Sequence, residues 1–78
     1  MRQKISVDFQ NADTAGRVRL NTVGTEQDIE RLGLKLEDGL SLLLFDRERE
    51  ADGEAEWSRE ENLWVARVDW NAVREIAE

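Results

Sequence analysis

The chain has 78 residues, and a single domain of that size buries only about 60% of the surface its unfolded chain exposes. It has no cysteine and no histidine, which excludes disulfides, thiolate metal sites, a cysteine nucleophile and the most common general base. Residues 1–21 carry a net charge of +2 and residues 22–78 one of −9, so the acidic body repels nucleic-acid backbones. No apolar run has the roughly 20 residues of a membrane span. We therefore expect one cytoplasmic domain over residues 1–78, with no cofactor and no membrane contact.

In the first half of the chain, residues 5–9 alternate apolar and polar side chains, and residues 17–21 do so again. This period of two predicts two strands, each with one buried face, which we expect to pair as a hairpin across a polar loop. Thr25 then predicts the start of a helix, because its hydroxyl can accept a hydrogen bond from the first turn. Gly33 predicts the end of this helix after at most two turns.

In the second half, residues 40–45 are apolar on both faces, which predicts a strand that is covered on each side. Residues 46–53 are charged and end in Asp-Gly, so we expect a solvated loop there. Residues 54–59 and 63–69 alternate again and predict a second pair of strands. The resulting pattern is five strands with a short helix between the second and the third.

A short C-terminal helix is expected after a cap at Asp69 or Asn71, with Val73 and Ile76 as its apolar positions. The count and order of elements fit a small five-stranded SH3-like barrel. An OB fold fits less well, because its helix lies between the third and fourth strands.

Two segments resemble SH3-type domains. Residues 36–42 resemble the diverging turn of that family, and residues 63–67, Leu-Trp-Val-Ala-Arg, resemble its aromatic strand. The whole chain also resembles small bacterial SH3-like barrel proteins, a resemblance that implies a fold and little else. The chain has no tyrosine, and no proline follows the Trp strand, whereas peptide-binding SH3 domains line their grooves with tyrosines. The resemblance therefore implies a barrel and argues against recognition of proline-rich peptides.

The tryptophans Trp57, Trp64 and Trp70 allow two interpretations. An aromatic patch could stack a peptide, sugar or base, but all three side chains share the parity of neighbouring small and apolar residues, which favours core packing. Trp70, at the end of its strand, is the one we most expect to be half-exposed at the rim of the barrel.

The charged loop and two strand ends are candidates for a metal site or a catalytic site. The spacing of the acids resembles a calcium loop only superficially, because Ala51 takes the place of the required glycine and two arginines lie among them. These acids are Asp46, Glu48, Glu50, Asp52 and Glu54. Asp46 and Asp69 could form a catalytic carboxylate pair, but aspartates commonly cap turns at strand ends. We therefore expect no enzyme activity.

The sequence thus favours a non-catalytic protein-interaction module, such as an accessory or regulatory subunit, that is a monomer or weakly self-associating. The candidate contact residues are Trp70, Trp57, Arg67 and Asp69. One alternative is a nucleic-acid-binding barrel that uses Arg2, Lys4, Arg17 and Arg19 as a local patch. For Arg17 and Arg19 we favour ion pairs with acids across the sheet. A metal-dependent or hydrolase-like activity at the charged loop is the other alternative.

Overall fold

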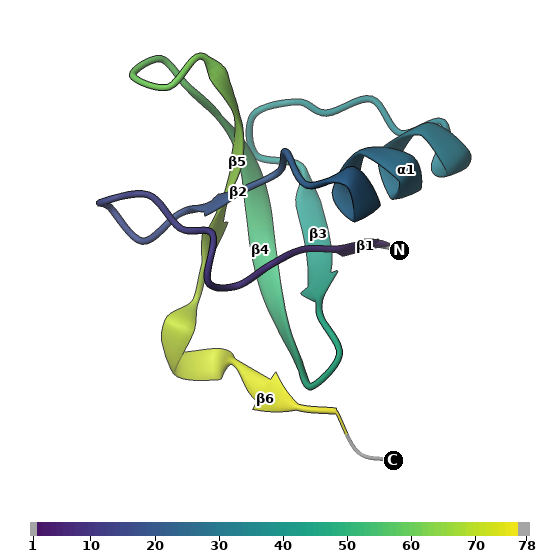
Figure 1. The fold of residues 1–78 in the computed structure, drawn as a ribbon, viewed down its shortest axis with the longest axis vertical. Helices are drawn as coiled ribbons and strands as arrows, with labels where there is room; N and C mark the ends of the chain where they lie inside the picture. Colours follow the sequence, from purple (N-terminus) through teal and green to yellow (C-terminus); the bar gives the residue numbers. More distant parts are fainter. Residues whose placement is uncertain (1, 77–78) are drawn as a thin grey trace.

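The computed structural model describes residues 2–76 and is mainly β, with one six-stranded sheet and one α-helix at its side (Figure 1). The helical elements are α1 (Val23–Leu32) and the 3-10 helix η1 (Trp70–Ala72). The strands are β1 (Gln3–Ser6), β2 (Val18–Arg19), β3 (Ser41–Phe45), β4 (Arg49–Ser58), β5 (Leu63–Val68) and β6 (Arg74–Glu75). The helix lies between the second and third strands, as predicted from the sequence.

The strands form one open sheet in the order β1-β3-β4-β5-β2, and β6 pairs with the first residues of β4. The predicted hairpin between residues 5–9 and 17–21 is wrong. β1 instead pairs in parallel with β3, with Ile5 opposite Leu44, and β2 pairs with β5. Alternation specifies which face of a strand is buried but not which strand lies beside it, and the long loop left the pairing open.

The core lies on the inner face of the curved sheet. Its centre consists of fully buried aliphatic side chains from β1, β2 and β3, packed over small residues of β4 and β5. Its buried members are Ile5, Val7, Phe9, Val18, Leu20, Leu42, Leu44, Ala51, Ala55 and Ala66. On β3, Leu42 and Leu44 are buried while the residues between and beside them are more exposed, so this strand has one fully covered face rather than two.

The prediction of a solvated loop over residues 46–53 is wrong, because the long strand β4 begins at Arg49. Only a tight turn precedes it, in which the Asp46 carboxylate accepts hydrogen bonds from the backbone N–H groups of Glu48 at 2.8 Å and Arg49 at 2.7 Å. The strand then runs for ten residues from Arg49. Ala51 and Ala55 occupy buried inner positions and the acids alternate with them on the other face. A strand whose inner residues are this small has too little apolar character to be recognised from sequence.

The helix α1 begins earlier than predicted and is longer, with ten residues. Its N-cap is Thr22, whose hydroxyl accepts from the Thr25 N–H at 3.1 Å. Thr25 is fully buried and donates its own hydroxyl to the Ser6 carbonyl at 2.6 Å. Asp28, one turn later, accepts from the Ser6 N–H at 2.8 Å. α1 therefore covers the backbone of β1 at Ser6, and it ends at Gly33 in a left-handed conformation, as predicted.

The C-terminal segment is helical only for the three residues of η1. Asp69 caps this turn by accepting from the Asn71 N–H at 3.1 Å, which confirms one of the two predicted caps. Val73 then returns to extended backbone, and β6 replaces the rest of the predicted helix because Arg74 and Glu75 pair with the start of β4. None of the described helices is long and apolar enough to cross a membrane.

Candidate functional site

The candidate contact residues do not form one cluster. Trp57 lies opposite Trp64 near the turn that joins β4 to β5, whereas Trp70, Arg67 and Asp69 lie toward the other end of β5. About four residues of β4 separate the level of Trp57 from that of Val68, which is roughly 13 Å at the rise of a strand. The structure therefore brings together three of the predicted residues and leaves Trp57 apart.

The expectation of core packing is wrong for Trp57, whereas the expected partial exposure of Trp70 is confirmed. Trp57 is 39% exposed and Trp70 is 44% exposed, whereas Trp64 is partly buried against the core. Trp57 has the predicted inward parity and packs edge-to-face on Trp64, with ring centroids 5.4 Å apart. Parity is correct here, but the core does not extend as far as the end of the hairpin.

Trp70 is half-exposed, as predicted, and it is firmly held. Its indole N–H donates to the Gly16 carbonyl at 2.8 Å. Its ring packs edge-on against the Phe9 ring, with the two ring centroids 6.1 Å apart. Gly16 has a φ of +80°, and a Cβ there would lie 3.3 Å from the indole nitrogen. A glycine is therefore the residue that suits both this backbone conformation and the approach of the indole.

Beside Trp70 lies a surface hollow of about 530 Å³, which we call the Trp70 hollow. It forms where the chain before β2 separates from β5, so that the loop around Gly16 faces Val68 and Arg67. Its lining residues are Ala15, Gly16, Arg17, Glu56, Arg67, Val68 and Trp70. The hollow thus combines a fixed aromatic ring and an aliphatic side chain with charges of both signs.

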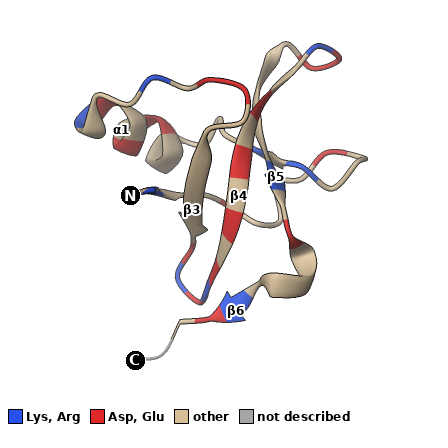
Figure 2. Ribbon diagram, turned by 180° about the vertical axis from the view of Figure 1, so that it is seen from behind, with Lys and Arg blue, Asp and Glu red and all other residues tan. Residues whose placement is uncertain are grey.

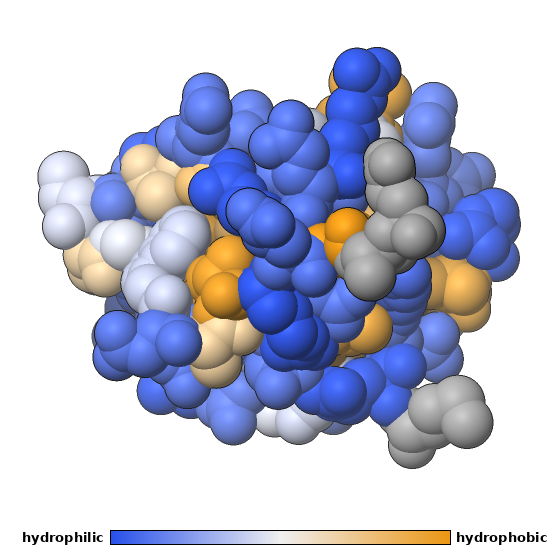
Figure 3. Space-filling view, turned by 90° about the horizontal axis from the view of Figure 1, so that it is seen from below, coloured by the Kyte–Doolittle hydropathy of each residue, from blue (hydrophilic) through white to orange (hydrophobic). Residues whose placement is uncertain are grey.

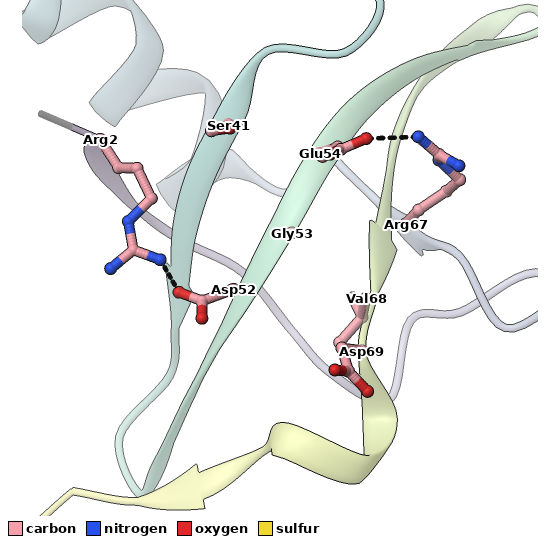
Figure 4. Close-up of a pocket in the computed structure, with 8 residues that line it drawn as sticks. All are labelled: Arg2, Ser41, Asp52, Gly53, Glu54, Arg67, Val68 and Asp69. Atoms are coloured by element: carbon pink, nitrogen blue, oxygen red, sulfur yellow. Dashed lines mark hydrogen bonds and ion pairs between the residues drawn. The ribbon is translucent and has the colours of Figure 1, made fainter.

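A second hollow, of about 400 Å³, lies on the other side of Arg67 (Figure 4). It spans the outer surface of β3, β4 and β5, between the Arg2–Asp52 ion pair and the Arg67–Glu54 ion pair. Asp69 lines this second hollow but not the Trp70 hollow. Arg67 and Val68 line both hollows. The end of the molecule that carries η1 and β6 has only small, separate apolar patches among hydrophilic side chains (Figure 3).

The outer face of β4 carries an acid at every second position, visible as red bands along the strand in Figure 2. Each of these four acids pairs with at least one arginine from a neighbouring segment. The pairs are Glu50 with Arg74, Asp52 with Arg2 and Arg74, Glu54 with Arg67, and Glu56 with Arg17 and Arg67. The acidic spacing read from the sequence is therefore a ladder of ion pairs across a sheet.

Arg17 and Arg19 pair with acids, as predicted. Arg17 donates to Glu56 at 2.6 Å, to Asp13 at 2.8 Å and to Glu60 at 3.2 Å. The hydrogen bond that Arg17 donates to the Glu56 carboxylate is the main reason that the pKa of the Arg17 guanidinium is raised. Arg19 binds both carboxylate oxygens of Glu61 at 2.7 Å, which raises its pKa as well. These guanidinium groups are already bound to carboxylates and do not form a free basic patch.

Asp13 holds the loop that carries Gly16, and we expect it to contribute to acid unfolding. Burial acts to raise the pKa of Asp13, but hydrogen bonds from the backbone N–H groups of Arg17 and Ala15 outweigh it and lower the pKa. The unfolded carboxyl, with a pKa of about 3.9, therefore takes up a proton at a higher pH than the folded one. The contribution of Asp13 to the free energy of unfolding is fully present above about pH 4, and it is lost as the pH falls through the pKa of the folded carboxyl.

Urea unfolding of wild type and Asp13→Asn tests this expectation at about pH 7 and about pH 3. The variant should be about 1 kcal/mol less stable than wild type at neutral pH and should lose less stability in acid, because its amide does not titrate. An identical loss of stability in both proteins would show that Asp13 does not contribute to the acid response.

The two carboxylates considered for catalysis have structural partners. Asp46 caps the turn before β4 and Asp69 caps η1. Within residues 2–76, no group of three or more acidic side chains is arranged to hold a metal ion.

The sequence analysis missed one apolar surface, between α1 and the start of β5. It includes Leu34 and Leu36, which lie between α1 and β3. The sequence signal for this surface is the alternation of two leucines directly after the helix stop at Gly33. In the structure both leucines are only partly buried.

The chain matches no family profile, no characterised protein and no solved structure.

Proposed function

We propose that the sheet is a variant of the SH3-like barrel. The support is the path of residues 3–13, which connects the two ends of the sheet. β1 lies at one end beside β3, and the chain then runs to the other end, where the Asp13 N–H donates to the Arg17 carbonyl at 2.8 Å. The Arg19 N–H donates to the Asn11 carbonyl at 2.9 Å in the same region. One continuous segment thus forms the end strand β1 and borders the other end strand, β2.

We further propose that the protein is a non-catalytic interaction module, an accessory or regulatory subunit that contacts a partner protein through the Trp70 hollow. The single observation that carries this proposal is a half-exposed indole held by a hydrogen bond and an aromatic contact. A fixed tryptophan loses little conformational entropy on binding, and tryptophan and arginine are enriched among the residues that dominate binding energy. Arg67 and Glu56 beside it can recognise charge in the partner.

The free edges of the sheet favour contact through side chains over addition of a partner strand. Ser6 of β1 already bonds through its N–H and carbonyl to α1. β2 has only two residues, and the segment 11–13 bonds its outer side. A nucleic-acid partner is disfavoured because Arg17 and Arg19 are bound to carboxylates and the chain carries a net charge of −7.

Substitution of Trp70 tests the proposal. A partner recovered from the source cells by affinity capture is titrated by calorimetry against wild type, Trp70→Ala and Trp57→Ala. We expect Trp70→Ala to weaken binding about 30-fold, since a central aromatic contact contributes about 2 kcal/mol or more. Trp57→Ala is the matched control, because it removes an equally exposed indole from the far end of the hairpin, and it should bind within about twofold of wild type.

Folding of Trp70→Ala must be checked by its unfolding transition, because the substitution also removes the bond to Gly16. A folded Trp70→Ala variant that binds as tightly as wild type would refute the assignment. So would a Trp70 fluorescence signal that acrylamide cannot quench.

A further inference from the structure

A third hollow, of about 460 Å³, lies between α1, the segment that follows it and the start of β5. We call it the α1 groove. Asn21, Glu26 and Glu30 are among its nine lining residues, and the other six are apolar side chains, of which only Leu20 is buried in the core. They are Leu20, Ile29, Leu34, Leu36, Leu63 and Trp64. The volume of the groove is within the range of ligand-binding pockets, and like such pockets the groove is lined mostly by apolar side chains.

Two carboxylates border the α1 groove, and among the described residues neither has an arginine or lysine partner. Glu26 and Glu30 are exposed, lie one helical turn apart and form no ion pair within residues 2–76. The neighbouring Arg31 pairs with Asp28 instead, at 3.2 Å. By contrast, all four acids on the outer face of β4 have arginine partners. At Glu26 and Glu30, negative charge that is available to another molecule therefore lies beside an apolar groove.

We propose that the α1 groove binds an amphipathic helical segment of another protein, with aliphatic side chains in the groove and lysine or arginine beside Glu26 and Glu30. The apolar walls provide the surface for anchors at helical spacing. The unpaired carboxylates provide complementary charge, which selects basic over acidic segments. The groove is distinct from the Trp70 hollow, which lies toward the other end of β5, so the two proposals can fail separately.

Charge also argues against the other occupants. Two copies of a chain with a net charge of −7 repel each other, and most arginines that could offset this are in internal pairs. Anionic lipid surfaces and nucleic acids would face the same unpaired carboxylates. A basic segment of a partner protein is the occupant for which both the groove and its border are complementary.

The test uses the synthetic peptide LKKLLKLLKKLLKL as probe, together with its charge-reversed counterpart in which glutamate replaces every lysine. Backbone amide NMR of the intact protein should show shifts confined to α1, residues 34–36 and residues 63–64 when the basic peptide is added. The double variant Glu26→Gln/Glu30→Gln should bind the basic peptide about fivefold more weakly, the effect of two exposed ion pairs. Neither substitution touches the core.

The matched control is Glu48→Gln/Glu75→Gln, which removes the same charge from two exposed acids, one in the turn before β4 and one on β6. It should bind within about twofold of wild type, because exposed charges farther away than about 10 Å are screened. An equal loss in both double variants would overturn the proposal, since it would reduce the effect to overall charge. Tight binding of the acidic peptide, shifts centred on Trp70, or a dimer that buries the α1 groove would also overturn it.

Discussion

Replacing Gly53 with alanine is expected to destabilise the protein by about 2–3 kcal/mol, the cost of overpacking a rigid site. A Cβ at this position would lie 2.8 Å from the Arg67 carbonyl oxygen and 2.8 Å from Cδ1 of Leu44. The first of these atoms is backbone, held by the β4–β5 pairing, so it cannot move aside without breaking the sheet. Urea unfolding followed by tryptophan fluorescence measures the change.

Gly24→Ala is the control for Gly53→Ala. Its Cβ would meet only the Ser6 hydroxyl oxygen at 3.2 Å, and a serine side chain can rotate away. Because alanine also favours the helical backbone, we expect a change of less than about 1 kcal/mol in either direction. If Gly53→Ala were as stable as Gly24→Ala, the close approach of β4 to β3 and β5 would not limit the residue at position 53.

Leu44→Ala is expected to cost about 3 kcal/mol, because it leaves a cavity at the centre of the core. Leu44 is fully buried and lies between Ile5 on β1 and Ala51 on β4. A domain of 78 residues has a total stability of about 4–12 kcal/mol, so this single change removes a large part of it. Chemical and thermal unfolding should both show the loss.

Leu43→Ala makes the same chemical change one residue earlier, on the outer face of β3. Leu43 is only partly buried there, opposite Lys4 and Asp52, and we expect a cost of about 1 kcal/mol. The difference between the two variants measures the burial of the inner face directly. Equal losses at both positions would mean that the strand is covered similarly on both faces, as the apolar run itself suggested.

The local periodicity of the sequence predicted several elements correctly. The strands around residues 41–45 and 63–68, the helix stop at Gly33 and the cap at Asp69 follow from side-chain alternation and from turn chemistry. These features depend on neighbours within a few residues. The ion pairs of Arg17 and Arg19 were also predictable, because outward arginines in an acidic chain find carboxylate partners.

The placement of the candidate site was only partly predictable. Partial exposure of Trp70 is predicted from its place at the end of a strand, and its side chain is half-exposed. The separation of Trp57 from Trp70 was not expected, because equal parity says nothing about how far the core extends along a strand. The α1 groove was missed for a similar reason: Leu34 and Leu36 come close to Trp64 only when the chain folds back over β5.

By itself, the sequence determined a mainly β domain with one helix after its second strand, and it determined which face of most strands is buried. These properties arise from hydrophobic periodicity and backbone preferences, which act over a few residues. Only the tertiary structure decided that β1 pairs in parallel with β3 and that the acidic run becomes β4. Both depend on contacts between segments distant in the chain, where ion pairs and inner alanines stabilise a strand whose own residues have little tendency to form one.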